Sequence, residues 1–329
     1  MSSRYSNRIT RMSWVETLSV LNLLALVLLY FNIFYWKNAL LSEDFSIAKV
    51  GHKTALSISE AKTKFLACIT PERVPETNRK WGTQFKEQLY DCLNQHIPIK
   101  KYELDTLKAI NVEYKYFLPM DKSYYADQSK DCIWLTAGIG NNTQAEREFL
   151  KLYPKCKFFG IELVPANVAD YGTFGKVINT GIGFDGKEKI VDKYTDYAGT
   201  VHRNLKIRPF VNILDQDVGS RLMHYAAIDI DGFEFPMLKE FGDSGQYHLN
   251  GVVICQMDIE WHAEIKDVVK DDFEFGTYMR QLFQDATSYL PIFAEPYSPG
   301  HPWAIKMTMI NIKNSECELA FRFSKYFER

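Results

Sequence analysis

The stretch from Asp131 to Pro165, DCIWLTAGIGNNTQAEREFLKLYPKCKFFGIELVP, constrains the fold of this chain more than any other. A short apolar run at its start predicts a strand, Gly138-Ile139-Gly140 a tight turn, and the residues after the turn a helix. A second apolar run, from Lys157 to Leu163, carries Glu162 near its end. This order predicts a βαβ unit, in which backbone N–H groups of the turn and of the helix N-terminus face a ligand.

The predicted turn and the strand-end acid indicate a pocket for an adenosine-type ligand. The turn lacks the third glycine of the dinucleotide fingerprint G-x-G-x-x-G, which serves close packing of helix against strand. We therefore expect a ligand without pyrophosphate, and S-adenosylmethionine meets this description. Its methionyl end would lie against the turn, and Glu162 would accept both ribose hydroxyls. The predicted cofactor-binding residues are Ala137, Gly138, Ile139, Gly140, Asn141, Glu162, Gly181 and Ile182.

Two parts of this set have a second interpretation. Gly181 and Ile182 follow a predicted third strand, Lys176–Thr180, at the level of an adenine, but a plain turn explains them equally well. Asn141 begins the N-glycosylation sequon Asn141-Asn142-Thr143. A glycan there would block a cofactor held by the turn, so we predict that the sequon is unused.

The amino terminus predicts a membrane anchor. Residues 17–36, TLSVLNLLALVLLYFNIFYW, carry no charge and are long enough for a helix that spans a bilayer. A cleaved signal peptide is the alternative, but no small-x-small cleavage site follows. Arginines precede the span, whereas a single lysine and then two acids follow it. The positive-inside rule therefore predicts a cytosolic tail, residues 1–16, and a remainder that is lumenal or outside the cell. We expect the Golgi or the endoplasmic reticulum, and the cell surface is the alternative.

The remaining chain predicts a stem and helical lead-in over residues 37–130 and a catalytic-type domain over residues 131–329. Helical spacing of apolar residues extends over Ser59–Ile69 and Asn78–Leu93, and Tyr102–Ile110 predicts another short helix.

Further strands and helices alternate after the βαβ unit. A buried strand enters Ile228-Asp229-Ile230-Asp231, Gly251–Ile259 predicts the next strand, and Pro209–Leu214 reads as a shorter piece of strand. A long helix over Asp272–Tyr289 then precedes a closing antiparallel pair, Ile292–Glu295 and Ala304–Ile312. This order predicts an α/β, Rossmann-like fold with a mostly parallel sheet and an antiparallel terminal strand.

Charge and cysteine content narrow the function further. Lys and Arg number 39 against 41 Asp and Glu, which gives a formal charge of −2 and no basic excess for nucleic acid. The six cysteines show no zinc-ligand spacing. Cys132 and Cys255 lie in predicted interior strands and are interpreted as buried thiols. The other four, Cys68, Cys92, Cys156 and Cys317, are the candidates for disulfides, with no pairing assigned.

Acidic side chains gather where two predicted strands end. Asp229, Asp231 and Glu234 follow one strand, and His262 follows the next in the sequence Glu260-Trp261-His262. The carboxyl ends of parallel strands form the ligand crevice of such a sheet. We predict Asp229, Asp231 and His262 as catalytic residues, with His262 a general base because its ordinary pKa lies near working pH. Asp231 as a helix cap is the alternative. No metal site is predicted; Asp229 and Glu234 would be the ligands of any ion that binds.

Four motifs in this order resemble the FkbM-type family of S-adenosylmethionine-dependent methyltransferases. They are Glu162-Leu163-Val164-Pro165, Val211–Asp217 (VNILDQD), Ile228–Glu234 followed by Met237-Leu238-Lys239, and Val252–His262 (VVICQMDIEWH). Ala227 and Asp231 depart from the lysine and glutamate of the family pattern, and Leu163 replaces a proline. The resemblance covers roughly residues 131–312 and implies a class I methyltransferase-like fold.

The expected function is transfer of a methyl group from S-adenosylmethionine to a glycan or another small hydroxylated acceptor. The resemblance implies an O-methyltransferase, and the anchor places it in the secretory pathway. Two alternatives stay open. A type II glycosyltransferase would use Asp229 and Asp231 as a metal-binding D-x-D, and a non-catalytic membrane protein would keep the fold as an interaction module.

Overall fold

The structure, a computed structural model, describes residues 56–69, 83–109, 113–195, 199–262, 272–298 and 301–329. All of them belong to one compact unit, residues 55–329. The predicted cytosolic tail, membrane span and stem lie outside the described residues, as does the beginning of the predicted second helix. Within the described ranges, no helix combines the length and the apolar character needed to cross a bilayer.

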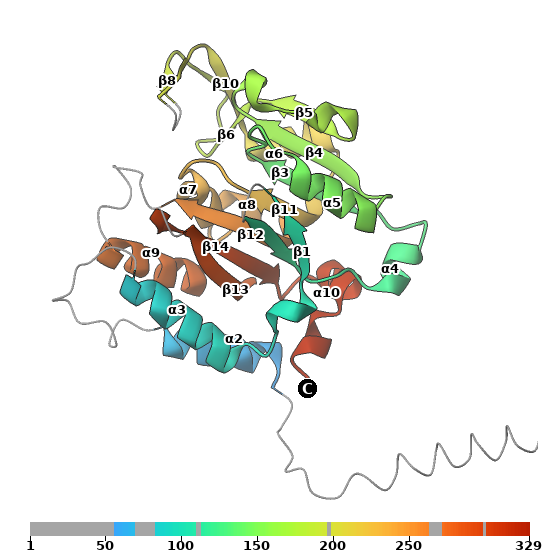
Figure 1. Cartoon of the computed structure of the whole chain (residues 1–329), viewed down its shortest axis with the longest axis vertical. Coiled ribbons are helices and arrows are strands. Elements are labelled where there is room, and N and C mark those ends of the chain that lie inside the picture. Colours follow the sequence, from blue (N-terminus) through green and yellow to red (C-terminus); the bar gives the residue numbers. More distant parts are fainter. Residues whose placement is uncertain (1–55, 70–82, 110–112, 196–198, 263–271, 299–300) are drawn as a thin grey trace, which may run out of the picture. The chain divides into compact units, whose positions relative to one another are not determined.

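A seven-stranded sheet forms the centre of this unit (Figure 1). Its strand order is β13-β14-β12-β11-β3-β4-β5, and the strands from β12 to β5 are parallel. β14 runs antiparallel to both of its neighbours. The predicted α/β fold with a mostly parallel sheet and an antiparallel terminal strand is therefore confirmed. The strands are β3 (Ile133–Ala137), β4 (Lys157–Glu162), β5 (Lys176–Asn179), β11 (Leu222–Ile228), β12 (Val253–His262), β13 (Tyr289–Ser298) and β14 (His301–Asn311).

Helices connect the strands and cover both faces of the sheet. Helix α5 (Gln144–Leu152) joins β3 to β4, and α7 (Glu234–Lys239) with α8 (Gln246–Leu249) joins β11 to β12. Helix α9 (Asp272–Asp285) precedes β13, and α10 (Ser315–Phe321) follows β14. Asn142 serves the start of α5, since its Oδ1 accepts a hydrogen bond from Gln144 N at 2.7 Å. Such a cap satisfies one of the N–H groups that a helix start leaves without a partner.

Aromatic side chains fill the layer between the sheet and α5. Trp134 of β3 and Tyr225 of β11 are register partners, so they lie side by side on the same face. Phe149 of α5 packs on both, with ring centroids 4.3 Å and 4.6 Å away. Phe117, from the lead-in, packs edge-on against the same two rings. Full burial of such rings contributes about 1.5–3 kcal/mol each, so this cluster is a main source of stability.

The lead-in is only partly helical. It contains α2 (Ile58–Cys68) and α3 (Thr83–His96), which pack with α9 at one side of the unit (Figure 1). The helix predicted over Tyr102–Ile110 is wrong, because a single turn η2 (Lys101–Glu103) leads there into strand β1 (Asp105–Lys108). β1 pairs with β2 (Tyr114–Phe117) in an antiparallel hairpin. The partner strand β2 lies outside the segment predicted as a helix. Strand pairing with β2 therefore outweighs the helical spacing of apolar residues within that segment.

Strand β2 covers a polar stripe on β12. Gln256 and Asp258 point to the same face, because side chains alternate along a strand, and both are buried. Asp258 Oδ2 accepts a hydrogen bond from Tyr116 N at 2.9 Å, and Gln256 Oε1 accepts one from Leu118 N at 2.8 Å. Gln256 also donates to Leu118 O at 2.8 Å. These side chains provide the partners that a buried edge of β2 requires.

A second, smaller sheet stands beside β5. Its order is β6-β10-β7, from Gly181–Gly183, Leu205–Pro209 and Lys189–Val191, and a short hairpin, β8 (Tyr194–Thr195) with β9 (Val201–His202), extends from it. The strand predicted over Pro209–Leu214 is wrong. The chain there forms helix α6 (Phe210–Ile213) and the π-helical turn η5 (Leu214–Val218), with Pro209 at the N-cap. Proline is favoured near a helix start, and Phe210 and Ile213 are both fully buried, as their helical spacing allows.

All six cysteines form disulfides: Cys68–Cys92, Cys132–Cys156 and Cys255–Cys317. The prediction that Cys132 and Cys255 are buried thiols is therefore wrong. Each does lie in or beside an interior strand, but each is bonded to another buried cysteine, Cys156 before β4 and Cys317 in α10. A buried position did not exclude a partner that arrives from another layer.

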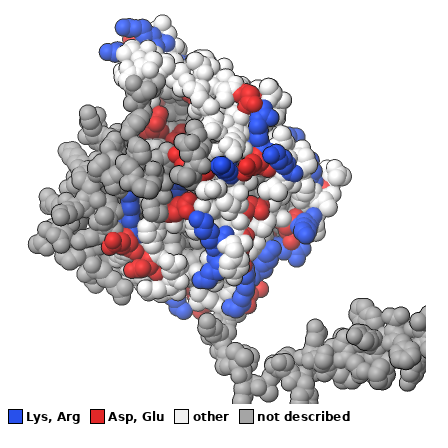
Figure 2. All heavy atoms as spheres, viewed as in Figure 1, with Lys and Arg blue, Asp and Glu red and all other residues white. Residues whose placement is uncertain are grey.

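The described surface carries charges of both signs. On the face shown in Figure 2, Lys and Arg side chains are interspersed with Asp and Glu. Charges that alternate in sign produce no extended positive field, and such a field is what attracts a polyanion. This face therefore gives no electrostatic footprint for nucleic acid.

The longer disulfide loop should contribute more stability. Replacing Cys255 and Cys317 by alanine opens a loop of 62 residues, which the chain-entropy relation values at about 4 kcal/mol. Replacing Cys68 and Cys92 opens one of 24 residues, at about 3 kcal/mol. Guanidinium denaturation of the two full-length variants measures both losses. A larger loss for the shorter loop would contradict this account.

Candidate functional site

The main pocket lies where the strand order of the sheet reverses. β3, β4 and β5 succeed one another in one direction, whereas β11 and β12 lie on the other side of β3. A pocket of about 390 Å³ opens here, within the range of small-ligand sites. Residues directly after four parallel strands line it, namely Gly138, Leu163, Thr180 and Asp229. A crevice outside the carboxyl ends of the strands, at the reversal point, is where open α/β sheets bind their ligands.

The glycine turn is held by both neighbouring strands. Gly138 has φ +84°, and its N–H donates to Ile161 O of β4 at 2.9 Å. A Cβ on Gly138 would lie 1.7 Å from the carbonyl oxygen of Asp229, at the end of β11. Gly140 also has a positive φ, +60°, but a Cβ there would meet no atom within 4 Å. Glycine is thus required at 138 by a backbone approach and at 140 by conformation alone.

Glu162 is built into the same turn. Its Oε2 accepts hydrogen bonds from Ile139 N at 3.0 Å and Gly140 N at 3.1 Å, and its Oε1 accepts one from Val164 N at 2.8 Å. Burial raises the pKa of this carboxyl, and the three N–H donors oppose that effect. A carboxylate offers about four lone pairs, so about one remains for a ligand. Glu162 can therefore accept one ribose hydroxyl, not both as the sequence suggested.

The small sheet β6-β10-β7 forms one wall of the pocket. Gly181, Ile182 and Ile207 line it, and a Cβ on Gly181 would lie 2.4 Å from Ile207 Cδ1. Glycine at 181 thus permits β6 to pack closely on a side chain of β10. Phe184 and Phe233 add an aromatic pair to the wall, stacked at 6.4 Å. These side chains are apolar, as the wall of a site for a purine base would be.

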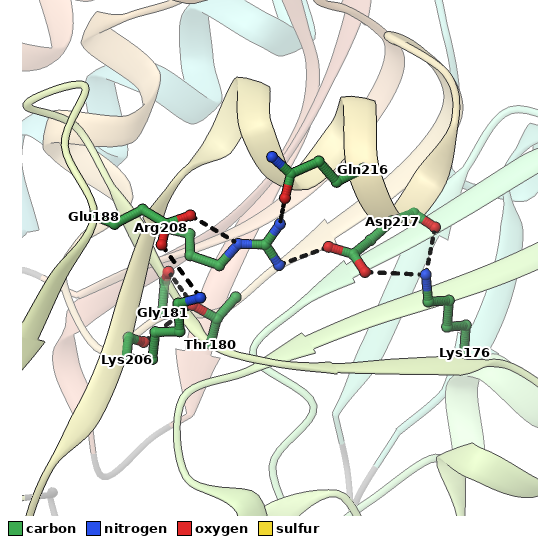
Figure 3. Close-up of polar contacts among 8 residues, drawn as sticks. All are labelled: Lys176, Thr180, Gly181, Glu188, Lys206, Arg208, Gln216 and Asp217. Atoms are coloured by element: carbon green, nitrogen blue, oxygen red, sulfur yellow. Dashed lines mark hydrogen bonds and ion pairs between the residues drawn. The ribbon is translucent and has the colours of Figure 1, made fainter.

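A polar network fastens that wall to the main sheet (Figure 3). Arg208 of β10 donates from Nη1 to Asp217 Oδ2 and from Nη2 to Gln216 Oε1, both at 2.6 Å. Lys176 of β5 donates to Asp217 Oδ1 at 3.0 Å. Asp217 therefore links the edge strand of the main sheet to the wall. Both hydrogen bonds come from the charged guanidinium of Arg208, and its two Nη atoms have different acceptors. The pair of bonds therefore fixes the orientation of the guanidinium as well as its position.

Acidic side chains form the opposite side of the pocket. Asp229 and Asp231 line it, and Asp231 lies in a left-handed turn with φ 50°, followed by Gly232 with φ 93°. The N-cap of α7 is Phe233, so Asp231 does not cap that helix. Tyr194 OH from the β8–β9 hairpin lies 3.5 Å from Asp231 Oδ2. The turn thus aims Asp231 into the pocket and leaves it available for a ligand.

Asp229 has the ionisation properties of a base. Partial burial raises the pKa of Asp229, the charge of Glu260 raises it further, and His262 and Lys115 lower it in part. The same neighbours act differently on Glu260. Burial opposes its ionisation, but the hydrogen bond from His262 and the charge of Lys306 outweigh burial and lower the pKa. A carboxylate with a raised pKa is a better proton acceptor near neutral pH.

His262 is the last residue of β12, not a residue beyond it. Its Nδ1 lies 3.1 Å from Glu234 Oε1, and its Nε2 lies 3.4 Å from Glu260 Oε1 and 3.9 Å from Asp229 Oδ1. Burial acts against the charge, but these carboxylates raise the pKa of His262 to about 11. A histidine protonated at neutral pH cannot take up a proton, so the role of general base fits Asp229 better.

Asp229, Asp231 and His262 each offer a ligand atom within 4.8 Å of the others. A metal ion binds neutral imidazole, so His262 would have to lose a proton first. Charged groups that balance the carboxylates are already present, namely His262 itself, Lys306 at 3.3 Å from Glu260 Oε2, and Lys115. We therefore assign no metal to this group.

The structure brings together most of the predicted site residues. Gly138, Gly140, Glu162, Gly181, Ile182, Asp229 and Asp231 line one pocket. Three others do not: Ala137 is buried in β3, Ile139 packs below the turn, and Asn141 is exposed beside a separate shallow hollow. His262 lies behind Asp229. Their proposed roles, and the unused sequon at Asn141, stay predictions.

Several residues of the site were missed. Phe184, Tyr194 and Ile207 belong to the small sheet and its hairpin, whose strands are too short to give a clear period. Lys115 and Lys306 come from β2 and β14. A single lysine in a strand carries no local signal of a buried partner. Phe184 is the one residue of this group with a local signal in the sequence, because it directly follows the predicted Gly181-Ile182-Gly183 turn.

Comparison with known proteins finds only distant similarity. No protein-family model matches the chain, and no curated protein matches it. Among solved structures, a fibrillarin pre-rRNA processing protein from Methanococcus jannaschii is 12% identical, covering 65% of this chain and 84% of that one, with a TM-score of 0.34. TrmK from M. capricolum, in complex with S-adenosylhomocysteine, is 11% identical, with coverages of 56% and 64% and a TM-score of 0.32. Human methyltransferase-like protein 13, also with S-adenosylhomocysteine, is 10% identical, with coverages of 61% and 82% and a TM-score of 0.32. Similarity this distant identifies no relative, so the functional conclusion rests on the pocket.

The two turn glycines should differ in their tolerance of a side chain. Gly138→Ala places a methyl group against the Asp229 carbonyl, and we expect it to lower the free energy of unfolding by about 3 kcal/mol or more. Gly140→Ala is the matched control, with a cost of about 1–2 kcal/mol from backbone conformation alone. Urea denaturation of both variants measures the difference. Equal losses would show that the approach to β11 does not constrain the turn.

Proposed function

We propose that this protein is an S-adenosylmethionine-dependent methyltransferase that methylates a hydroxyl group of a glycan or another small acceptor. The observation that carries the proposal is the charge of the pocket at the strand reversal. Its charged lining residues are Glu162, Asp229, Asp231 and Lys189, three carboxylates against one lysine. Such a pocket attracts a cationic ligand and repels a polyphosphate.

The adenosine half of the ligand fits the first three strand ends. A purine would lie on the apolar wall formed by Ile182, Phe184 and Ile207. Glu162 would accept one ribose hydroxyl, using the lone pair that the turn leaves available. The sulfonium would then lie towards Asp229 and Asp231, where its positive charge is favourable. The volume of about 390 Å³ suits a ligand of this size.

The acidic lining separates this proposal from the glycosyltransferase alternative. A nucleotide sugar carries a pyrophosphate, which Asp229 and Asp231 would repel in the absence of a bridging cation. Neither a glycine-rich phosphate loop nor a cluster of arginines lines the described part of the pocket. A sulfonium needs no such counter-ion.

The residues of this chain need to orient the acceptor hydroxyl towards the methyl group and to supply a base for its proton. S-adenosylmethionine brings a methyl group that its sulfonium already activates for transfer. Asp229, beside the proposed sulfonium position, accepts the proton of the acceptor hydroxyl. The Gly138 turn fixes Asp229, because the Asp229 carbonyl occupies the space that a Cβ would take. Such alignment of reacting groups accounts for most of the acceleration in a transfer of this kind.

Three disulfides support the proposed location in the secretory pathway. Disulfides persist in oxidising compartments and are rare in the cytosol. With the predicted anchor over residues 17–36, we propose a single-pass type II membrane protein whose residues 55–329 are lumenal, in the Golgi or the endoplasmic reticulum.

Calorimetry on the full-length protein tests the ligand. We expect S-adenosylmethionine and S-adenosylhomocysteine to bind, and a uridine diphosphate sugar with Mn²⁺ not to bind. Labelled S-adenosylmethionine with a panel of glycans then reports transfer. Binding of the nucleotide sugar alone would favour the glycosyltransferase. If neither kind of ligand binds, the hypothesis of a non-catalytic membrane protein that uses the fold as an interaction module would be favoured.

Replacement of the proposed base should slow transfer with little effect on binding. We expect Asp229→Asn to lower kcat by about 10²–10⁴-fold, the usual contribution of a general base. Because the pKa of Asp229 is raised, transfer by the unmodified protein should increase as the pH rises above the ordinary carboxylate range. Asp215→Asn is the matched control, since Asp215 pairs with Arg221 at the surface. An unchanged pH profile in Asp229→Asn would exclude this role.

A further inference from the structure

The imidazole of His262 is surrounded by hydrogen-bond acceptors. Nδ1 faces Glu234 Oε1 at 3.1 Å, and Nε2 faces Glu260 Oε1 at 3.4 Å. An ionised carboxylate accepts hydrogen bonds and donates none. Each ring nitrogen must therefore carry a hydrogen to satisfy its partner. Only the doubly protonated imidazolium has both.

Glu260 connects this ring to a lysine on the next strand. Its Oε2 lies 3.3 Å from Lys306 Nζ, while its Oε1 faces His262. Glu260 and Lys306 are register partners of β12 and β14, and both side chains are only 3% exposed. Lys306 Nζ also lies 3.6 Å from Glu113 Oε2. Because the sheet fixes both backbones, the pair has one arrangement, and loss of Lys306 would leave Glu260 buried without that charge.

Three more charged groups act on this chain of contacts. Asp229 Oδ1 lies 3.9 Å from His262 Nε2. Burial raises the pKa of Asp231, from the same turn, and the charge of His262 opposes that rise. Half-buried Lys115 of β2 interacts with Asp229 and Glu260. Among the described elements, β2, β12, β14, α7 and the turn after β11 each contribute a charge near the ring, and the closest of these charges to the ring nitrogens are carboxylates.

Exposure shows which member of the chain can meet a substrate. The side chains of Glu234, Glu260 and Lys306 are 0%, 3% and 3% exposed. His262 is 25% exposed, and Asp229, its neighbour towards the pocket, is 39% exposed. These three buried residues can act on a bound acceptor only indirectly, through His262 and Asp229, whereas His262 and Asp229 can both contact it.

We propose that Glu234, Glu260 and Lys306 hold His262 as a permanent imidazolium that donates a hydrogen bond to the acceptor oxygen beside Asp229. This inference rests on the proposed methyl transfer and divides the work between two residues. The acceptor hydroxyl gives its proton to Asp229 as the oxygen–carbon bond forms and the carbon–sulfur bond breaks, with the electron pair staying on sulfur. His262 stabilises the charge that develops on the oxygen and keeps both of its protons throughout. Glu260, Lys306 and Glu234 are positioning residues.

Nitrogen NMR of the imidazole in the full-length protein tests the protonation without any ligand. Comparison with His262→Gln assigns the signals. We expect both ring nitrogens of His262 to stay protonated up to about pH 9, well above the ordinary histidine range. In Glu260→Gln, and in the double variant Glu260→Gln/Lys306→Met, the midpoint should fall by about one pH unit or more. The double variant removes both charges together, so it leaves no buried ion uncompensated.

Lys130→Met is the matched control. Lys130 pairs with Glu316 of α10 at 2.8 Å and not with Glu234, Glu260 or His262, so its replacement should leave the midpoint unchanged. In the transfer assay, Glu260→Gln should lose activity at neutral to alkaline pH, where the unmodified protein stays active. A His262 that titrates near its ordinary value in the folded protein, or an unmoved midpoint in folded Glu260→Gln, overturns the inference even where transfer occurs. A protonated His262 without S-adenosylmethionine binding supports the imidazolium and refutes the proposed function instead.

Discussion

The site depends on pairing of charges that the sheet takes out of water. Along one face of β12, every second residue from Gln256 to His262 is polar, and all but the last are buried. A buried carboxylate without a partner is costly, by several kcal/mol even after the protein relaxes. Lys306 on β14 and Lys115 on β2 supply the opposite charges. The antiparallel strand and the lead-in hairpin are therefore components of the site, although neither lies at the strand reversal.

This dependence explains why a single pocket can hold two carboxylates with different tasks. Glu162 is committed to the glycine turn through three backbone donors. No backbone N–H in the described part of the chain donates to the Asp229 carboxylate, and the charge of Glu260 raises its pKa. One acid is thus a fixed part of the scaffold, and the other remains reactive. The difference arises from their neighbours and not from their side chains.

Local sequence predicted the central part of the fold. The run from Asp131 to Pro165 forms β3, the turn, α5 and β4, and Asp229 and Asp231 follow a strand as expected. These features depend on periodicity and on residues that are adjacent in the chain. Parallel strands end at a common edge of the sheet. The position of each acid at the end of its strand was therefore enough to predict that these acids line one pocket.

What could not be predicted depends on partners distant in the sequence. Tyr102–Ile110 has helical spacing but pairs as a strand, and Cys132 and Cys255 look like core thiols until Cys156 and Cys317 reach them. Lys306 has no distinguishing neighbour in the chain. Its partner, Glu260, is defined only by the register of β12 against β14.

The contacts of β2 also determine when the site can form during synthesis. Tyr116 bonds to Asp258 and Thr308, which lie 142 and 192 residues later. A chain made from its amino terminus therefore exposes the hairpin long before its partners exist. Until β14 has emerged, Glu260 lacks Lys306, and Cys255 lacks Cys317. Nascent chains that end before β14 can therefore contain the glycine turn and α5, but they cannot form the complete charged network around Glu260.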